Sequence, residues 1–274
     1  MDPLARMRYV GVRPKKGLGQ NFLVDDEALE RIIAAAELTK DDTVVEIGPG
    51  PGILTPGLCG RAKQVVAVEL DQEMIPVLKE MTEGVRNLEI RQEDILQVDS
   101  KEFPQPYKVV ANVPYYITSA IIKHFLKSTN RPDEMTLTIQ AEVAERIAAE
   151  PPKMSVLAVS VQLYGKPSIA GRIKAEAFWP SPNVDSAILR ITGIGKDTDR
   201  MLGGLSEADF FKVVKAGFAE KRKQIHNSLA RNLAIPGEAV TELLKAAGIE
   251  PARRAETLTV PEWVRLGSVY VENR

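Results

Sequence analysis

A glycine-rich run, Gly48-Pro49-Gly50-Pro51-Gly52, and an acidic residue, Glu69, have a spacing that points to nucleotide chemistry. Glycines let backbone N–H groups approach a ligand where a side chain would collide with it. Glu69 lies 21 positions after Gly48, where nucleotide-binding folds place the carboxylate that accepts hydrogen bonds from ribose hydroxyls. The loop is shorter than Gly-x-Gly-x-x-Gly, so it suits a nucleoside cofactor such as S-adenosylmethionine better than a pyrophosphate. The alternative is a purely structural turn.

Two further polar segments could contact a bound nucleoside. Asp94 could accept a hydrogen bond from an adenine amino group, or it could simply cap a helix. The segment Asn112-Val113-Pro114-Tyr115 combines an amide oxygen, a rigid turn and the π-face of an aromatic ring. It indicates a site that holds a planar base by its amino group. The alternative is a strand-to-helix turn with a buried tyrosine.

The secondary structure around these positions must bring them together. β-Branched apolar runs alternate with amphipathic segments, which predicts an α/β fold with a mostly parallel sheet. The expected strands are 44–47, 65–71, 88–92, 107–111, 135–140, 168–174 and 184–192. The expected helices are one beginning near 25, and 53–60, 72–81, 119–126, 141–150 and 154–164. Ligands bind at the carboxyl ends of parallel strands, so the candidate residues should meet at one edge of the sheet.

The pattern divides the chain into three parts. Residues 1–13 are expected to form a flexible basic tail, and residues 14–193 form the α/β domain that carries the candidate site. The stretch 193–204 is rich in glycine and charge and is the expected linker. Residues 204–274 are helical in pattern, with a capping box at its fourth helix. The four helices are expected to begin near residues 206, 220, 237 and 259.

The composition of the 274 residues limits the class of protein. Hydrophobic residues make up 44% and the formal net charge is −1, so the chain can bury a core but has no global basic field. Basic residues are concentrated locally, with six of them against one acidic residue between Phe211 and Arg231. Cys59 is the only cysteine and no apolar run could span a membrane, which favours a cytoplasmic protein. The two histidines, His124 and His226, lie far apart, so no metal site is expected.

These motifs resemble those of the small-subunit ribosomal RNA adenine dimethyltransferases, the kasugamycin-resistance methylases. The resemblance runs from about residue 14 to residue 271. It rests on the segments Gly19-Gln20-Asn21-Phe22-Leu23, Glu46-Ile47-Gly48-Pro49-Gly50-Pro51-Gly52, Val68-Glu69-Leu70-Asp71, Asp94-Ile95-Leu96, Asn112-Val113-Pro114-Tyr115, 178–186, Phe218-Ala219-Glu220-Lys221-Arg222-Lys223-Gln224 and Asn227-Ser228-Leu229. Departures are small: Val113 stands where leucine is usual, Pro51 replaces a leucine or phenylalanine, and Trp179 and Ser181 are unusual.

The resemblance implies a Rossmann-like S-adenosylmethionine-dependent methyltransferase sheet with a smaller all-helical C-terminal domain that binds RNA. It implies dimethylation at N6 of two adjacent adenosines near the 3′ end of small-subunit (16S) rRNA, linked to subunit maturation. The implied cofactor-binding residues are Asn21, Leu23, Gly48, Gly50, Glu69, Leu70, Asp94, Ile95 and Asn112. The implied catalytic residues are Asn112, Pro114, Tyr115 and Phe178, and the implied RNA-binding residues are Lys221, Arg222 and Lys223.

Simple chemistry is consistent with these roles. The exocyclic amine of adenine is a poor nucleophile because its lone pair is delocalised into the ring. Acceptors for the two amino hydrogens, here the Asn112 side-chain oxygen and the Val113 or Pro114 carbonyl, favour a pyramidal nitrogen. Positioning and electrostatics then supply the rate, and no strong general base is needed. Tyr115 and Phe178 would stack on the extruded base, although Phe178 could equally line the core.

The expected partners are small-subunit rRNA and the assembling small subunit, with the protein acting as a monomer away from membranes. Three other functions stay open. A related antibiotic-resistance methylase of large-subunit rRNA is disfavoured by the segment 178–186 and the C-terminal basic motif. A ribosome-assembly binding factor with little turnover is disfavoured by the intact glycine loop, Glu69 and Asn112. A DNA adenine methylase is the weakest choice.

Overall fold

The structure is a computed structural model that describes residues 9, 11, 13–220 and 222–273. The basic tail expected for residues 1–13 lies almost entirely outside the described residues. The chain forms two compact units, the first from residues up to 144 together with 166–194. The second comprises 145–165 and the chain from 195 onward. Residues 145–165 thus group with the C-terminal helices, whereas the division drawn from the sequence kept them with the sheet.

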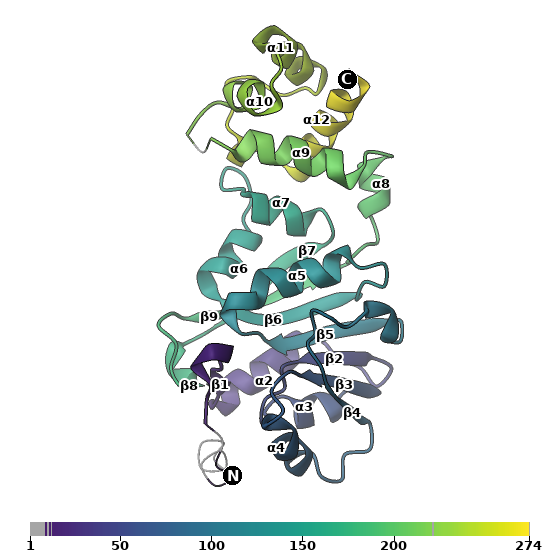
Figure 1. Cartoon of the computed structure of the whole chain (residues 1–274), viewed down its shortest axis with the longest axis vertical. Coiled ribbons are helices and arrows are strands. Elements are labelled where there is room, and N and C mark those ends of the chain that lie inside the picture. The colour runs from purple at the N-terminus through teal and green to yellow at the C-terminus, as the bar shows by residue number, and fades with distance from the viewer. Residues whose placement is uncertain (1–8, 10, 12, 221, 274) are drawn as a thin grey trace. The chain divides into compact units, whose positions relative to one another are not determined.

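The first unit is built on a seven-stranded sheet whose central strands are parallel (Figure 1). In spatial order the strands are β4 (Leu88–Gln92), β3 (Gln64–Glu69), β2 (Thr43–Ile47), β5 (Tyr107–Asn112), β6 (Glu134–Gln140), β9 (Ser186–Thr192) and β7 (Lys166–Ile173). The first five are parallel, while β9 pairs antiparallel with β6 and β7 antiparallel with β9. The predicted α/β fold with a mostly parallel sheet is confirmed.

The central strands form because their sequence suits burial on both faces. Every residue of β2 is buried, and most of β3 is too, since β-branched valines pack well between layers of helices. The parallel register aligns Ile47 of β2 with Val68 of β3 and Ala111 of β5. The loops that follow these three strands therefore leave the sheet at the same edge.

The helices of the first unit follow the expected pattern closely. Asp25 caps the first long helix through its carboxylate, which accepts from the Ala28 N–H at 2.6 Å, and Ile32 and Ile33 of that helix are buried. The crossover between β4 and β5 contains only a short 3-10 helix in place of an α-helix. The elements are η1 (Lys16–Leu18), α2 (Asp26–Ala35), α3 (Thr55–Cys59), α4 (Met74–Met81), η2 (Ser100–Glu102), η3 (Tyr115–Ile117), α5 (Thr118–Lys127) and η4 (Ala175–Ala177). Helix α6 (Ala141–Ile147) begins in the first unit and ends in the second.

A two-stranded ribbon, β1 (Phe22–Leu23) with β8 (Phe178–Trp179), joins two segments that are distant in the sequence. Leu23 lies opposite Phe178, and both side chains are buried in a cluster with residues of α2 and α3. Phe22 lies opposite Trp179, and these two pack against Met74. Because successive side chains of a strand point to opposite faces, the pair Leu23–Phe178 and the pair Phe22–Trp179 pack in two different clusters.

The second unit is helical, as predicted for residues after 204. Two details differ from the expectation: the proposed linker contains α8, because Thr198 and Leu202 are buried there, and the second long helix begins at Ile225 rather than near 220. The chain turns just before Ile225, with the Lys223 N–H donating to the Glu220 carbonyl. The helices are α7 (Val156–Gln162), α8 (Thr198–Leu202), α9 (Glu207–Phe218), α10 (Ile225–Leu233), α11 (Gly237–Ala246), η5 (Ala255–Thr257) and α12 (Val260–Glu272).

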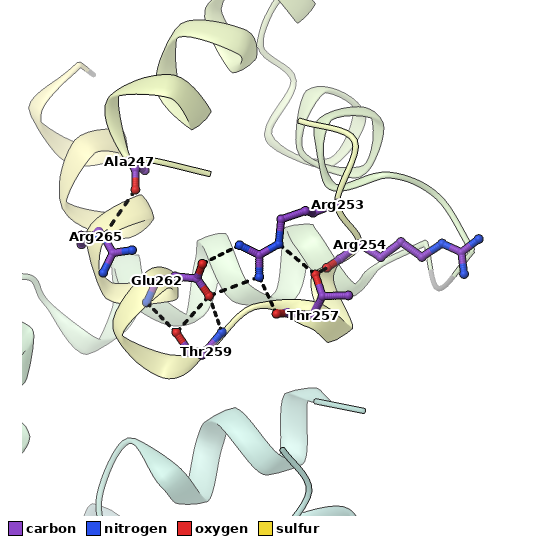
Figure 2. Close-up of polar contacts among 7 residues, drawn as sticks. All are labelled: Ala247, Arg253, Arg254, Thr257, Thr259, Glu262 and Arg265. Carbon is purple, nitrogen blue, oxygen red and sulfur yellow. Dashed lines mark hydrogen bonds and ion pairs between the residues drawn. The ribbon is translucent and has the colours of Figure 1, made fainter. Parts of the chain in front are cut away.

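The start of α12 is fixed by a polar network around Arg253 (Figure 2). Thr259 and Glu262 form the predicted capping box, in which the Glu262 carboxylate accepts from the Thr259 N–H at 2.8 Å. The Arg253 guanidinium pairs with the same carboxylate and donates to the Thr257 hydroxyl at 3.1 Å. Arg253 lowers the pKa of Glu262 to about 2, chiefly through this charged hydrogen bond.

Candidate functional site

The pocket lies at the carboxyl ends of β2 and β5, where the chain order of the sheet reverses. Open parallel sheets bind ligands in the crevice at such a switch point. The empty space within the pocket is about 820 Å³, counting space open to solvent. It gathers ten of the residues that the sequence singled out: Asn21, Gly48, Gly50, Glu69, Leu70, Asp94, Ile95, Asn112, Pro114 and Tyr115.

The glycine loop after β2 requires glycine at each of its three positions. Gly48, Gly50 and Gly52 have φ values of 62°, 56° and 84°, a region that other residues rarely adopt. A Cβ at Gly52 would lie 2.9 Å from a methyl carbon of Leu78, whereas a Cβ at Gly48 would meet nothing within 4 Å. The loop is therefore tightly packed behind Gly52 and open beside Gly48, where the backbone faces the pocket.

Glu69 ends β3 with its carboxylate tied to the backbone. One oxygen accepts from the Gly50 N–H at 2.8 Å and the other from the Asp71 N–H at 2.7 Å. Burial raises the pKa of Glu69, while these backbone donors work in the opposite direction. A carboxylate has about four acceptor sites, so Glu69 keeps the capacity to accept from a further hydroxyl group at the pocket wall.

Asp94 follows β4, and Leu70 follows Glu69, on the same side of the pocket. One Asp94 oxygen accepts from the Leu96 N–H at 3.0 Å, so the side chain does stabilise its own turn. Its other oxygen has no partner within the described residues and remains available to an amino group. Leu70 is 52% exposed and Ile95 is buried, which gives this end of the pocket two apolar walls.

Asn112 ends β5 with its amide in a defined orientation. Its Nδ2 donates to the backbone carbonyl of Asn21 at 3.1 Å. Only the amide nitrogen can pair with a carbonyl oxygen, so Oδ1 is turned away from Asn21. Within the described chain, nothing donates to that oxygen. A free acceptor thus stands at the pocket beside the Pro114 turn.

Tyr115 is held at the pocket by its hydroxyl group. That hydroxyl shares a 2.7 Å hydrogen bond with the Ser186 hydroxyl, at the fully buried start of β9. Burial raises the pKa of Tyr115, so the ring stays neutral. Ser186 lies within the sequence motif 178–186, but its support of the ring could not be assigned before the fold was known.

Residues 18–22 line the pocket as part of a strap, residues 15–22, whose anchors were missed in the sequence. Asp71 is the anchor: its carboxylate accepts from the Lys15 ammonium at 2.8 Å and from the Gln20 amide at 3.0 Å. Burial alone would raise the pKa of Asp71, but the hydrogen bonds from Lys15 and Gln20 outweigh it and the pKa is lowered. Asp71 and Gln20 both lie in motifs singled out from the sequence, but nothing in those motifs indicated that the two side chains pair.

Two predicted site residues are not at the pocket. Leu23 and Phe178 are 2% and 3% exposed. They lie opposite each other in the two-stranded ribbon, and both side chains belong to the same core cluster. Strand alternation directs Phe178 into the core and Trp179 to the other side. This position matches the packing alternative that the sequence left open, while stacking of Phe178 on a base stays a prediction.

The predicted basic run belongs to the second unit. Arg222 and Lys223 are exposed in the turn before α10, and Lys221 lies outside the described residues. In the described part of the chain, neither Arg222 nor Lys223 forms an ion pair. Their charge is therefore open to an anionic partner.

A buried carboxylate lies beneath the glycine loop. Glu46 of β2 is 1% exposed, and both of its oxygens lack a hydrogen-bond partner among the described residues. Burial raises the pKa of Glu46 to about 8, and the nearby charge of Glu69 adds to this effect. Burial therefore favours the protonated form of Glu46.

The described residues contain no cluster of three or more potential metal ligands. None of the described helices is long and apolar enough to cross a membrane.

Comparisons with known proteins agree with this geometry. The chain matches the family model for ribosomal RNA adenine dimethylase over residues 11–271. It is 45% identical over 265 residues to the ribosomal RNA small subunit methyltransferase A of Dehalococcoides mccartyi (strain ATCC BAA-2266 / KCTC 15142 / 195), covering 96% of this chain and 90% of that protein.

Solved structures with a similar fold include a dimethyladenosine transferase and an rRNA methyltransferase. A dimethyladenosine transferase from Plasmodium falciparum has a TM-score of 0.78 at 26% identity, covering 89% of this chain and 95% of that one. The 23S rRNA methyltransferase ErmE has a TM-score of 0.73 at 30% identity, covering 91% and 99%. With a family model spanning nearly the whole chain and a pocket of the matching kind, this chain belongs to the ribosomal RNA adenine dimethylases, which are S-adenosylmethionine-dependent methyltransferases.

Proposed function

We propose that this protein dimethylates N6 of two adjacent adenosines near the 3′ end of small-subunit rRNA during maturation of that subunit. The observation that carries the proposal is the orientation of Asn112, whose amide nitrogen is bound to Asn21 and whose oxygen is a free acceptor at the pocket. The relative from Dehalococcoides mccartyi, named for small-subunit methylation, supports this choice of substrate.

The residues present fit S-adenosylmethionine. Glu69 would receive the ribose hydroxyls, and Asp94 the adenine amino group between Leu70 and Ile95. The backbone at Gly48 and Gly50 would lie along the nucleoside, because the loop leaves open space beside Gly48. When bound, this cofactor supplies the electrophilic methyl group. The strap with Asn21 would close over the methionine end, while Leu23 supports that strap from the core.

The protein's part in the chemistry is to hold the target amine. The Asn112 oxygen and a backbone carbonyl of the Val113-Pro114 turn would accept the two N6 hydrogens. Their pull favours a pyramidal nitrogen and frees its lone pair from the ring. Pro114 stiffens the turn, and the Tyr115 ring, fixed through Ser186, would stack on the base. Preorganised acceptors of this kind need no general base.

Phe178 has a supporting role in this proposal. We assign it to the core behind Leu23, where it supports the strap rather than the base. Arg222 and Lys223 would contact RNA phosphates without reading sequence. The protein would act as a monomer on the assembling small subunit in the cytoplasm, where its substrate is made.

One labelling experiment tests this function. Purified small and large subunits from a strain lacking the modification are incubated separately with tritiated S-adenosylmethionine, and the labelled nucleotides are mapped. We expect label only in small subunits, on two adjacent adenosines as dimethyladenine. Label in large subunits would instead favour the ErmE-like alternative, to which the fold similarity also extends. Absence of label in both would favour an assembly factor.

A further inference from the structure

A second groove lies on the first unit beside the pocket, between α5 and the segment that carries η2. Figure 1 shows α5 lying across the sheet. Because the crossover from β4 to β5 forms only the short η2, α5 faces an irregular segment there instead of a full helix. The groove is more open to solvent than the pocket.

The lining of this groove is strongly basic. Lys123 and Lys127 lie one turn apart on α5 with His124 beside them, and Lys101 approaches from η2. Lys101 and Lys123 are exposed, and neither forms an ion pair within the described chain. The only acidic side chain in the lining is Asp99, which already accepts from the Lys101 N–H at 3.0 Å.

This concentration of positive charge is unusual for its surroundings. The segment from Asp41 to Asp99, which builds much of the same unit, has twelve acidic and five basic residues. Basic residues in the last turn of a helix stabilise its negative end, which accounts for His124 and Lys127. That effect does not account for Lys101, which comes from a different element. Moreover, the Nε2 atom of His124 is buried without a hydrogen-bond partner among the described residues.

Neighbouring residues line the pocket and the groove. Ile95 lines the pocket and Leu96, the next residue, lines the groove. Ile117 lines the pocket and Ala120, about one turn along α5, lines the groove. Along α5 the lining residues run from Ala120 to Lys127, about 10 Å at 1.5 Å per residue, and the axial rise from Lys123 to Lys127 is about 6 Å.

We propose that this groove binds the sugar-phosphate backbone of the substrate RNA next to the adenosine that enters the pocket, through Lys101 and Lys123. The inference rests on the proposed function, since it takes RNA as the substrate of the adjoining pocket. Lysines suit this task because a compact ammonium group pairs with phosphate without demanding a fixed geometry. The contact would position the strand independently of its sequence.

The test compares two double variants of the full chain. Lys101→Ala/Lys123→Ala removes the groove cations, and Lys63→Ala/Lys79→Ala removes two exposed lysines of the same unit that line neither cavity. Binding of a synthetic RNA hairpin from the 3′ end of small-subunit rRNA is measured by fluorescence anisotropy at several salt concentrations. Melting temperature and S-adenosylmethionine affinity are measured alongside.

We expect the groove variant to bind the hairpin on the order of tenfold more weakly near 0.1 M salt, with a log–log salt slope shallower by about 1.4–1.8. The cofactor affinity and melting temperature of the groove variant should match those of wild type. The control variant should match wild type in RNA affinity, salt slope, cofactor affinity and melting temperature. Lys101→Arg/Lys123→Arg keeps the positive charges and should show the wild-type salt slope of hairpin binding. If the alanine variant proves unstable, loss of affinity in this arginine variant would contradict the proposal. A groove variant with the affinity and slope of the control would overturn the proposal.

Two further arms separate the possible ligands. Inorganic phosphate and poly-glutamate are each tested for binding at constant ionic strength. If either binds wild type but not the groove variant while hairpin binding is unchanged, the groove serves a small anion or an acidic protein and the proposal is wrong. Because hairpin binding is measured directly, it decides the role of the groove even if wild type fails to methylate small subunits and the proposed function falls.

Discussion

The side-chain amide of Asn112 donates a hydrogen bond to the backbone carbonyl of Asn21 at 3.1 Å, across 91 positions of sequence. The contact ties the end of β5 to the strap that lines the pocket. It also settles which way the amide faces, because a carbonyl can accept only from the NH₂ group. The strap therefore orients the acceptor that we assign to the target amine, so the cofactor cover and the base site are mechanically joined.

Replacing Glu69 should weaken cofactor binding. Glu69→Ala removes the carboxylate that Gly50 and Asp71 hold in place, and with it the proposed ribose acceptor. We expect a loss of about 1.5–3 kcal/mol in S-adenosylmethionine affinity by calorimetry, the scale for hydrogen bonds to a charged group. Glu83→Ala, at an exposed position away from the pocket, is the control. Equal affinities for the two variants would remove Glu69 from the cofactor site.

Neutralising Asp71 should loosen the strap. Asp71→Asn keeps the shape but weakens the pair with Lys15, and Asp71 is 3% exposed by side chain. We expect faster trypsin cleavage near Lys15 and a higher KM for S-adenosylmethionine. Glu73→Gln is the matched control, because Glu73 also pairs with Lys15 but is 75% exposed, where ion pairs contribute little. Identical cleavage rates for wild type and Asp71→Asn would show that this anchor is dispensable.

Glu46 should make the protein less stable as the pH rises. Its pKa is about 8 in the folded state against 4.5 in an unfolded chain, so the folded state holds the extra proton between these values. Stability from this group is complete below pH 4.5 and is lost as the pH approaches 8. Glu46→Gln cannot ionise, so its melting temperature relative to wild type should increase from pH 5 to pH 8.5. A difference that stays constant over this range would contradict the assignment.

Glu262 should show the opposite dependence. Its pKa is lowered from 4.5 to about 2 by Arg253, so the stabilisation is present above pH 4.5 and is lost as the pH falls toward 2. We expect Arg253→Ala to cost on the order of 3 kcal/mol in urea unfolding near pH 7. The deficit relative to wild type should shrink steadily below pH 4.5. If it is the same at pH 3 and pH 7, the pair does not carry this energy.

Much of the fold and of the candidate site could be predicted from the sequence, because local residue patterns and characteristic spacings determine those parts. The valine runs of β2 and β3, the glycine loop and the distance to Glu69 follow from rules that act over a few dozen residues. The antiparallel pairing of β7 and β9 does not, since their order is set only when the sheet assembles. Nor does the pairing of Lys15 with Asp71, because nothing local links positions that are 56 residues apart.

Phe178 shows a different limit of sequence reasoning. A two-residue strand has no periodicity from which to tell which of Phe178 and Trp179 faces the core. Only the pairing with Leu23 and Phe22 decides that Phe178 is the buried one. Similarly, α8 escaped detection because its five residues lie in a glycine-rich stretch whose burial depends on neighbouring helices.

The most direct test of the account is the rate of methyl transfer by Asn112→Ala in a single turnover at saturating S-adenosylmethionine. Saturation is verified separately, because the resemblance also places this residue near the methionine end of the cofactor. We expect a rate lower by about 10²-fold or more, as when one preorganised polar contact to a transition state is deleted. Melting temperature and RNA affinity should stay near wild type, since phosphate contacts dominate the latter. Transfer at the wild-type rate would contradict the role of Asn112 as the acceptor that holds the target amine.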